Sequence, residues 1–397
     1  MNDSFLRTPC YIFSRDDFEH NIKAFKSILG KYFGNNWILG YSFKTNYLPY
    51  LLKSAKSEAC YAEVVSSKEY LLAKAVGFDS GRIIFNGPVK QKSHFLEAVE
   101  NECIVNIDSN REIKWLDELS VDKKYRVGIR VNFDLEKELP GHTLMGNEGG
   151  RFGFCIENGD LSRAICQIKK QENIEIDCLH MHVSSRTKSA DIYRQLIRRA
   201  VDVINKEHLS VKYIDIGGGF FGGGDDGSLY ETYIKAIKEE LIELGKNEIG
   251  IIVEPGASVV ATSVKYLVEV VDTKSTMQNK YVVTDGSRLH IDPFLTKTRY
   301  SYQIIADGDR ESEFEQTIVG FTCMEKDRFM KVENKKELKV GDRILFNTVG
   351  SYTMCMNSDF ISSEPRVYSE YNGKLYLVRN EKEISDYIDR DILEEVQ

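Results

Sequence analysis

Lys44 ends an apolar run, Trp37–Lys44, and is followed at once by Thr45 and Asn46. At an exposed strand end this lysine would be a solvated surface group, as most lysines are. At the mouth of a barrel its amine would instead face a cofactor or substrate. There the amine could form a Schiff base with an aldehyde, which makes a lysine a covalent catalyst. The residues at the ends of other apolar runs decide between these two interpretations.

Further apolar runs between residues 60 and 256 also end in polar, charged or glycine residues. The eight runs are Trp37–Lys44, Cys60–Ser66, Arg82–Gly87, Cys103–Ser109, Tyr125–Asn132, Ile176–Val183, Tyr213–Gly218 and Gly250–Gly256. Their ends carry Lys44, Glu63, Asn86, Asp108, Arg130, Asn132, His180, His182, Gly217, Gly218, Gly219 and Glu254. A parallel barrel gathers its strand ends at one face, where the chemistry takes place, so we expect these side chains to converge.

Three consecutive glycines, Gly217, Gly218 and Gly219, follow the seventh run. Without side chains, they let backbone N–H groups approach an anion closely. The loops after strands seven and eight are the usual phosphate site of such barrels. Ser185, after the sixth run, could add a hydroxyl to the same phosphate. A flexible strand-to-helix turn is the alternative interpretation of the glycines.

Glu254 ends the eighth run, and a buried carboxylate there needs a partner. The partner is either an internal arginine or a protonated ring nitrogen. His182 could stack on a flat ring, or it could be an ordinary core histidine. A lysine for an aldehyde, glycines for a phosphate, a histidine for a ring face and a carboxylate for a ring nitrogen together predict pyridoxal 5'-phosphate. Because a carboxylate keeps the ring nitrogen protonated, the ring becomes an electron sink for a carbanion.

The elements that position these residues alternate between strand and helix. The eight runs are nearly continuous in Val, Ile and aromatic residues, which is typical of strands buried on both faces of a parallel sheet. Helical spacing of apolar residues marks Ser67–Val76, Ser93–Asn101, Ala190–Lys206 and Tyr230–Leu244. This alternation predicts an α/β fold, a (β/α)₈ barrel over residues 20–262 that binds the cofactor. A doubly wound open sheet is the alternative.

The pattern changes near residue 263, after which strand-like runs follow one another with little helix between them. The runs are Tyr266–Val271, Lys280–Asp285, Phe314–Cys323, Arg343–Val349, Arg366–Tyr371 and Lys374–Val378. They predict a separate all-β domain, of β-sandwich or β-barrel type, over residues 263–397. We expect residues 1–19 to join it through a strand at Pro9–Phe13.

Composition excludes several classes of protein. The chain has 397 residues, of which 42% are hydrophobic and 29% charged, as in ordinary globular proteins. Its net charge of −8 and its dispersed basic residues argue against a nucleic-acid interface. No apolar run approaches the ~20 residues of a membrane span, and the N-terminus lacks a secretory signal. The eight cysteines form no Cys-x-x-Cys pair, so we expect no metal site and a cytoplasmic, reduced setting.

The order of motifs along the chain resembles the barrel-type, fold type III pyridoxal-phosphate decarboxylases, the group of diaminopimelate, ornithine and arginine decarboxylases. The resemblance covers nearly the whole chain. The matching segments are Thr8–Ile12, Tyr41–Asn46, Ala62–Ser66, Phe85–Gly87, Arg151–Gly153, His180–Ser185, Asp215–Gly219, Glu254–Gly256, Cys323–Asp327 and Gly350–Thr353.

This resemblance implies roles for individual residues. Lys44 would hold the cofactor as an internal aldimine, and His182 would stack on its ring. Cys323 would come from the second subunit of a homodimer and return a proton to the substrate, so that barrel and β domain of different subunits share each active site. The remaining cofactor contacts would be Ser185, Gly217, Gly218, Gly219, Glu254, Gly256 and Tyr352.

Some positions depart from the family pattern. Ala257 stands where the family usually has an arginine that touches the phosphate, and Ser184 replaces a glycine. Near the substrate, Met324 replaces an acid after Cys323. These departures leave open which residue replaces the missing arginine.

Two further positions bear on the substrate. Lys297 aligns with a second amine-recognising acid, and Asp292 aligns with the arginine that binds the distal carboxylate in diaminopimelate decarboxylases. Together with Met324 they disfavour an ammonium-ended substrate. We therefore expect a masked or anionic distal end, as in an amino acid conjugated during siderophore or natural-product biosynthesis. Diaminopimelate, ornithine or lysine is the conventional alternative, and drift in a specificity loop would also explain the changes.

Two other functions compete with decarboxylation. Alanine-racemase-like enzymes share a similar barrel and β domain, but that family typically places an arginine at the ring nitrogen, where this chain has Glu254. Non-catalytic pyridoxal-phosphate carriers resemble a barrel alone, and neither the β domain nor Cys323 fits them.

Overall fold

The computed structural model describes residues 6–224, 228–308, 310–357 and 359–388. The chain separates into two compact units, Glu19–Val260 and Met1–Phe18 with Ala261–Gln397. The ends of the predicted β domain, residues 1–5 and 389–397, lie outside the described residues. Among the described residues, no helix has the length and apolar character needed to cross a membrane.

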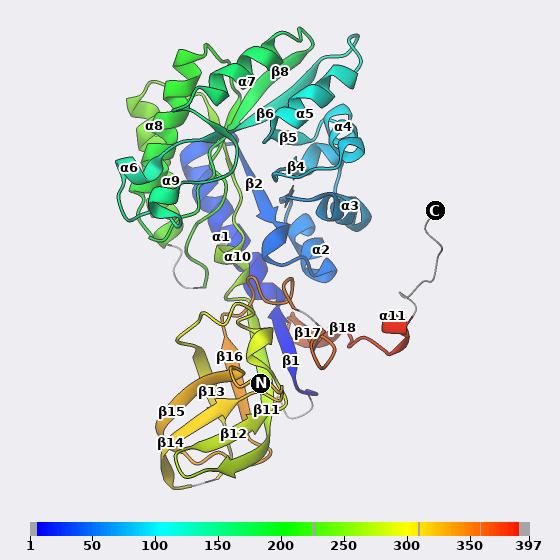
Figure 1. Ribbon diagram of the computed structural model, residues 1–397, viewed down its shortest axis with the longest axis vertical. Helices are drawn as coiled ribbons and strands as arrows, with labels where there is room; N and C mark the ends of the chain where they lie inside the picture. The colour runs from blue at the N-terminus through cyan, green and yellow to red at the C-terminus, as the bar shows by residue number, and fades with distance from the viewer. Residues whose placement is uncertain (1–5, 225–227, 309, 358, 389–397) are drawn as a thin grey trace. The chain divides into compact units, whose positions relative to one another are not determined.

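Eight parallel strands close into a barrel in the first unit (Figure 1). Each strand pairs with the next, and β10 pairs with β2 to complete the ring. The strands are β2 (Trp37–Ser42), β3 (Tyr61–Val64), β4 (Ile83–Phe85), β5 (Ile104–Ile107), β6 (Tyr125–Asn132), β8 (Ile174–His180), β9 (Tyr213–Asp215) and β10 (Gly250–Val253). A further short strand, β7 (Phe154–Cys155), pairs with β6. The predicted (β/α)₈ barrel is confirmed.

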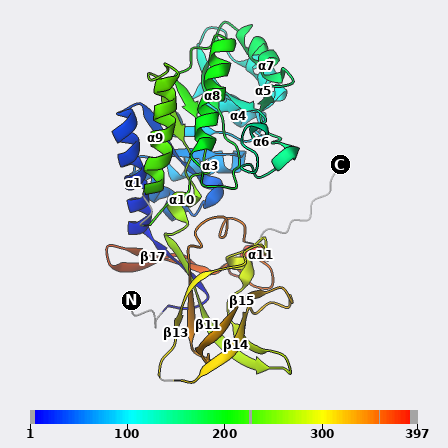
Figure 2. The same ribbon diagram turned by 90° about the vertical axis from the view of Figure 1, so that its left-hand side faces the viewer.

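Helices alternate with the barrel strands, beginning with α1 before β2, and the longer helices cover the outside of the ring (Figure 1). They are α1 (Arg15–Phe33), α2 (Pro49–Ser57), α3 (Ser67–Val76), α4 (Lys92–Glu100), α5 (Asn110–Trp115), α6 (Leu135–Glu138), α7 (Asp160–Lys169), α8 (Asp191–Lys206), α9 (Ser228–Glu243) and α10 (Ala257–Val260). Helices α8 and α9 lie side by side (Figure 2), and Arg198 of α8 pairs with Glu240 of α9. Helix α8 buries one apolar stripe at helical spacing, as an outer barrel helix must.

The second unit is built on a nine-stranded sheet of parallel and antiparallel pairs. Its strands are β1 (Cys10–Ser14), β11 (Val264–Ser275), β12 (Lys280–Thr284), β13 (Ser301–Ile305), β14 (Ser312–Val319), β15 (Arg328–Lys336), β16 (Arg343–Asn347), β17 (Arg366–Tyr371) and β18 (Lys374–Arg379). Strand β1 pairs antiparallel with β11 and parallel with β17, which confirms that the N-terminal strand joins this sheet. The sequence prediction missed β13 and β15. It also extended β14 to Cys323, whereas the strand ends at Val319.

A fully buried ion pair, Lys90 with Glu112, holds the ends of β4 and β5. The Lys90 amine lies 3.2 Å from both Glu112 oxygens and donates to the carbonyls of Gly87 and Asn106. Glu112 also accepts the backbone N–H of Asp108 at 2.8 Å. Burial lowers the pKa of Lys90 and raises that of Glu112, so each charge depends on the other. The pair therefore fixes the strand ends that present polar side chains to the barrel mouth.

Replacing Lys90 with methionine should lower the free energy of unfolding by about 3–5 kcal/mol, because it leaves the Glu112 charge buried without its cation. Urea unfolding followed by circular dichroism measures this change. Lys74→Met is the matched control, since Lys74 pairs with Glu97 at the surface of the same unit. That exposed pair should contribute less than about 1 kcal/mol. Equal, small effects of the two substitutions would contradict a stabilising role for Lys90.

Candidate active site

Lys44 lies in a 3₁₀ turn, Phe43–Thr45, directly after β2. Its amine donates to Glu63 Oε2 at 2.6 Å, and the Ser42 hydroxyl donates to the same oxygen at 2.5 Å. The Glu63 side chain is fully buried, whereas that of Lys44 is 37% exposed. The lysine is therefore neither a free surface group nor a core residue. An acid inside the barrel orients its amine at the mouth.

A chain of hydrogen bonds crosses the barrel interior from this ion pair. Asn86, after β4, donates to Glu63 Oε1 at 3.1 Å and to Glu254 Oε1 at 2.6 Å. Asn106, on β5, donates to Asn86 Oδ1 at 2.8 Å and to Asp215 Oδ2 at 3.2 Å. All five side chains are buried. Hydrogen bonds in such a low-dielectric interior hold each group in one orientation.

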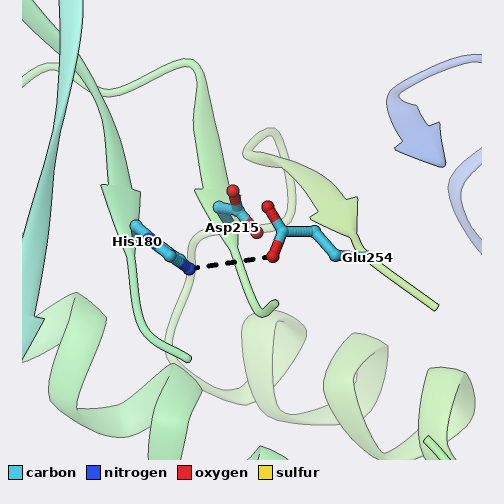
Figure 3. Close-up of side chains that lie close together, drawn as sticks. All are labelled: His180, Asp215 and Glu254. Atoms are coloured by element: carbon cyan, nitrogen blue, oxygen red, sulfur yellow. Dashed lines mark ion pairs between the residues drawn. The ribbon is translucent and has the colours of Figure 1, made fainter. Parts of the chain in front are cut away.

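Two carboxyl groups meet where β9 and β10 end. Figure 3 shows Asp215 and Glu254 facing one another, with the His180 ring turned toward Glu254. Burial, and then the neighbouring Asp215 and Glu63, raise the pKa of Glu254 well above its usual range. Burial also raises the pKa of Asp215 from its ordinary 3.8 to about 7. Because two buried carboxylates repel, this pair is stable with a proton between them or with a cation in its place.

His180 completes a cluster that could receive such a cation. Its Nε2 lies 3.8 Å from Glu254 Oε2, and one ligand atom from each of His180, Asp215 and Glu254 lies within 4.8 Å of the others. Burial and the nearby Arg130 lower the pKa of His180 well below its usual range, so its imidazole is neutral. The cluster could hold a metal ion or a protonated ring nitrogen. The Lys44 amine and the glycine loop favour the protonated ring nitrogen, because pyridoxal phosphate also carries an aldehyde and a phosphate.

His182 presents a neutral imidazole beside this cluster. The backbone N–H of Gly218 donates to His182 Nδ1 at 3.1 Å, which places the ring proton on Nε2. Burial, followed by the cations Arg130 and Lys44, lowers the pKa of His182 to about 3. A Cβ at Gly217 would lie 2.4 Å from that of His182, and Gly217 has φ +71°. Only glycine lets the loop lie this close to the ring.

The third glycine of the loop lies beside two hydroxyl groups. A Cβ on Gly219 would lie 3.7 Å from both the Ser185 Oγ and the Tyr193 hydroxyl oxygen. Gly219 itself is exposed and has φ +83°. Two hydroxyls around an exposed glycine form a cradle of the kind that suits a phosphate group.

Gly256 brings the Lys44 turn against the end of β10. A Cβ at this position would lie 2.0 Å from Thr45 Oγ1, so no other residue fits without moving the turn. The backbone N–H of Ser42 donates to the Pro255 carbonyl at 3.2 Å in the same region. The structure thus shows a packing role for Gly256, and its contact with the cofactor stays a prediction.

The other predicted site residues lie in the β unit. Cys323 is exposed in the turn after β14, and Met324, partly buried, donates its backbone N–H to Thr322 Oγ1 at 3.4 Å. Tyr352 is 42% exposed and has φ +54°. The side chains of Cys323 and Tyr352 are therefore accessible on this unit.

The Asp292 carboxylate is hydrogen-bonded within its own loop. Its carboxylate is buried and accepts from Arg288 Nη2 at 2.7 Å and from the Tyr300 hydroxyl at 3.1 Å. The backbone N–H groups of Thr296 and Lys297 donate to it as well, at 3.0 and 2.9 Å. The Lys297 amine donates to the Ile291 carbonyl at 2.8 Å. These contacts make Asp292 a structural residue of the loop, and its contact with substrate stays a prediction.

Residues 15–261 match the family described as "Pyridoxal-dependent decarboxylase, pyridoxal binding domain". The chain belongs to the pyridoxal-dependent decarboxylases. It is a pyridoxal-phosphate-dependent decarboxylase, and this assignment disfavours the racemase and carrier alternatives.

Similar proteins cover nearly the whole chain. It is 27% identical over 395 residues to the probable chloroplastic diaminopimelate decarboxylase of Oryza sativa, covering 96% of this chain and 79% of that protein. It is 26% identical to the diaminopimelate decarboxylase of Aquifex aeolicus, with 96% and 90% covered. Among solved structures, diaminopimelate decarboxylase from M. jannaschi superposes with a TM-score of 0.87 at 23% identity, covering 99% and 94%. Arginine decarboxylase of a Paramecium bursaria Chlorella virus gives 0.78 at 20%, covering 92% and 96%.

The residues at the barrel mouth fit pyridoxal 5'-phosphate. The group needs an amine, a partner for its ring nitrogen, a flat neighbour for its ring and donors for its phosphate. The amine of Lys44, the Asp215–Glu254 acid pair, the neutral ring of His182 and the cradle around Gly219 offer these four features.

Sequence reasoning missed several polar residues of the site. Asn106 and Asp215 lie inside strands that the sequence marks as apolar, and Tyr193 lies on α8. The available signal was a single polar residue inside an otherwise apolar barrel strand, which must find a partner when it points inward.

Asp215→Asn should change how the stability of the cofactor-free protein depends on pH. Folding raises the pKa of Asp215 from 3.8 to about 7, so the folded carboxyl keeps a proton that the unfolded chain loses. The stabilisation of the folded state by this proton is complete below pH 3.8 and is lost as the pH rises through about 7. Relative to the wild type, the variant should therefore gain stability as the pH rises from 3.8 to about 7.

Urea unfolding of both proteins across that pH range measures the difference. An asparagine keeps an oxygen for the Gly217 N–H, which Asp215 Oδ1 accepts at 2.9 Å, so the loop retains this contact. Parallel pH profiles for the two proteins would contradict the raised pKa.

Proposed function

We propose that this enzyme decarboxylates an amino acid whose distal end is masked or anionic, such as a side-chain conjugate formed in siderophore or natural-product biosynthesis. The observation that carries the chemistry is one hydrogen-bonded network with Lys44 at one end and the Asp215–Glu254 acid pair at the other. The relatives named diaminopimelate decarboxylases support amino-acid decarboxylation.

Pyridoxal phosphate, when bound, supplies an electron sink for the pair of electrons released as the Cα–carboxylate bond breaks. Glu254, with Asp215 behind it, holds a proton at the ring nitrogen. The neutral ring of His182 supports the flat face of the cofactor without adding a charge. Ser185 and the glycine loop bind the phosphate, with Tyr352 as a further donor. Lys44 would attach the cofactor, and Glu63 orients the Lys44 amine by accepting its hydrogen bond.

Cys323 holds the proton that returns to Cα after CO₂ has left. Its thiol is exposed on the β unit, in a turn rather than in a strand. In the homodimer that we propose, this thiol belongs to the partner subunit and reaches the barrel of the first. The exposed Tyr352 is consistent with the same arrangement.

We infer the charge of the substrate's distal end from the side chains at the two positions that the family uses to recognise it. Met324, next to Cys323, has a thioether that cannot pair with an ammonium group. Burial lowers the pKa of Lys297, whose amine is a donor rather than an acceptor. An ammonium-ended amino acid would lack a counter-charge at both positions. A carboxylate end could pair with the Lys297 amine, and an amide end carries no charge that needs a partner.

A substrate screen tests this proposal. We expect ornithine carrying a succinyl group on its side-chain amine to give a kcat/KM for CO₂ release at least tenfold above those of free ornithine, lysine and diaminopimelate. Lys44→Met should abolish release from every substrate, whereas Lys68→Met, at an exposed lysine of the same unit that contacts Tyr47, should not. A preference for diaminopimelate would overturn the proposed substrate class.

Cys323→Ala should lower the rate of amine formation about 10²-fold, because a positioned acid is lost. Cys166→Ala is the matched control, since Cys166 is an exposed cysteine of α7 in the barrel unit. Product analysis in D₂O measures the rate and the stereochemistry of proton return. Unchanged turnover in Cys323→Ala would remove the thiol from the mechanism.

A further inference from the structure

A cavity of about 260 Å³ lies at the amino-terminal end of the barrel, opposite the strand ends that present Lys44. We call it the floor cavity. Its lining includes the first residues of four strands: Tyr61 of β3, Ile104 of β5, Tyr125 of β6 and Tyr213 of β9. The volume lies just below the usual range of small-molecule sites. None of the roles assigned above uses these residues.

The inner wall of the floor cavity is a layer of the barrel core. Ile38 and Cys178 belong to a buried apolar cluster, and the side chains of Tyr61 and Tyr213 pack against that cluster. Both tyrosines are only partly buried. The wall therefore combines an apolar base with two aromatic rings that a bound molecule can contact.

The cations in the lining of the floor cavity are not paired with acids. Among the described residues, the side chains of Arg126 and Lys212 make neither a hydrogen bond nor an ion pair, although the Lys212 amine lies 5.0 Å from the centre of the Tyr213 ring. A third cation, Lys124, donates to the Glu172 carbonyl at 3.4 Å, which leaves its charge without a counter-ion. These charges remain available to an anion.

A shift in strand register brings one acid to this group of cations. Val127 of β6 pairs with Ile176 of β8, but the next residue, Gly128, pairs with Cys178. Asp177 is therefore an extra residue of β8 without a partner on β6. An extra residue of this kind redirects a side chain, and Asp177 lines the floor cavity.

The charges in the lining do not balance. Burial raises the pKa of Asp177, while Arg126 and Lys212 lie close enough to its carboxylate to lower it. The lining carries three cations, Lys124, Arg126 and Lys212, against two acids, Glu102 and Asp177. One positive charge is in excess. The fork of an arginine beside a lysine amine matches the oxygens of a carboxylate or a phosphate.

The floor cavity is separate from the site of the chemistry. Gly128 lies between Cys178, in the cavity wall, and Asn106, in the acid network. A Cβ on Gly128 would lie 3.2 Å from that of Cys178 and 1.9 Å from Asn106 Oδ1. Because Lys44 and the acid pair do not line the cavity, a molecule bound there occupies a second site.

We propose that the floor cavity binds a small organic anion, whose carboxylate or phosphate group pairs with Arg126 and Lys212 and whose flat apolar body packs against Tyr61 and Tyr213. The excess positive charge selects the anionic group, and the partly buried rings select a molecule with an aromatic or similarly flat body. This binding does not depend on which amino acid the enzyme decarboxylates.

Titration calorimetry of the cofactor-loaded enzyme with benzoate, phenyl phosphate and benzamide tests the assignment. Benzamide has the shape of benzoate without its charge. We expect at least one of the two anions to bind with a Kd of about 1 mM or tighter, and benzamide to bind about tenfold more weakly or worse than that anion. No binding of either anion, or binding of benzamide as tight as that of the anions, would overturn the proposal.

Substitutions in the lining distinguish the floor cavity from other anion sites of the enzyme. Arg126→Gln and Lys212→Gln should each weaken binding of the anion about tenfold, because each removes one charged donor. Asp177→Asn should tighten the same binding about threefold, because it removes a negative charge from the lining. Arg111→Gln, at an exposed arginine of α5 over the Trp115 ring and outside the cavity, is the matched control and should change nothing.

The opposite signs of these effects exclude a merely structural explanation, since a disturbed barrel floor would weaken binding in all three lining variants. Unchanged affinity in both Arg126→Gln and Lys212→Gln would show that the anion binds elsewhere and would overturn the assignment. Weaker binding in Asp177→Asn would contradict the proposed balance of charges.

Discussion

The structure depends on how three buried carboxyl groups are satisfied within one barrel. Glu63, Asp215 and Glu254 are all buried, and a buried charge is costly without a partner. Lys44 forms an ion pair with Glu63. A proton or a cation held between Asp215 and Glu254 reduces the repulsion of the other two groups. Asn86 bonds to both Glu63 and Glu254, so neither end of the network can move independently. The arrangement leaves one amine and one cation position facing the same mouth, which is the requirement of a protonated pyridine aldehyde.

The barrel positions these groups through its strand ends, one buried ion pair and two glycines. Parallel strands deliver the side chains to one rim, and the buried Lys90–Glu112 pair fixes the ends of β4 and β5. Gly217 and Gly256 allow backbone approaches that any Cβ would block. The polar network lies on short, tightly bonded strand ends, whereas the long connection between β6 and β7 can change in sequence without disturbing the acids.

The sequence predicted the barrel and the residues that follow its strands, because buried parallel strands are continuous apolar runs and their ends are marked by polar residues. It could not predict Asn106 and Asp215, since their inward direction depends on barrel register. Strands β13 and β15 were missed because their side chains are largely exposed and lack a clear apolar alternation. Cys323 was assigned to a strand, but the chain turns after Val319, where Gly320 packs against the Asp327 carboxylate. The pairing of Asp292 with Arg288 is a contact within one loop that no motif reveals.

The central claim is that the buried acid pair keeps the ring nitrogen of the cofactor protonated. Nuclear magnetic resonance of the enzyme loaded with ring-¹⁵N pyridoxal phosphate measures that protonation directly. The account predicts a pyridinium chemical shift in the wild-type enzyme at pH 8 and a neutral-pyridine shift in Glu254→Gln, with Lys44 attachment intact in both. A neutral-pyridine shift in the wild type would contradict it.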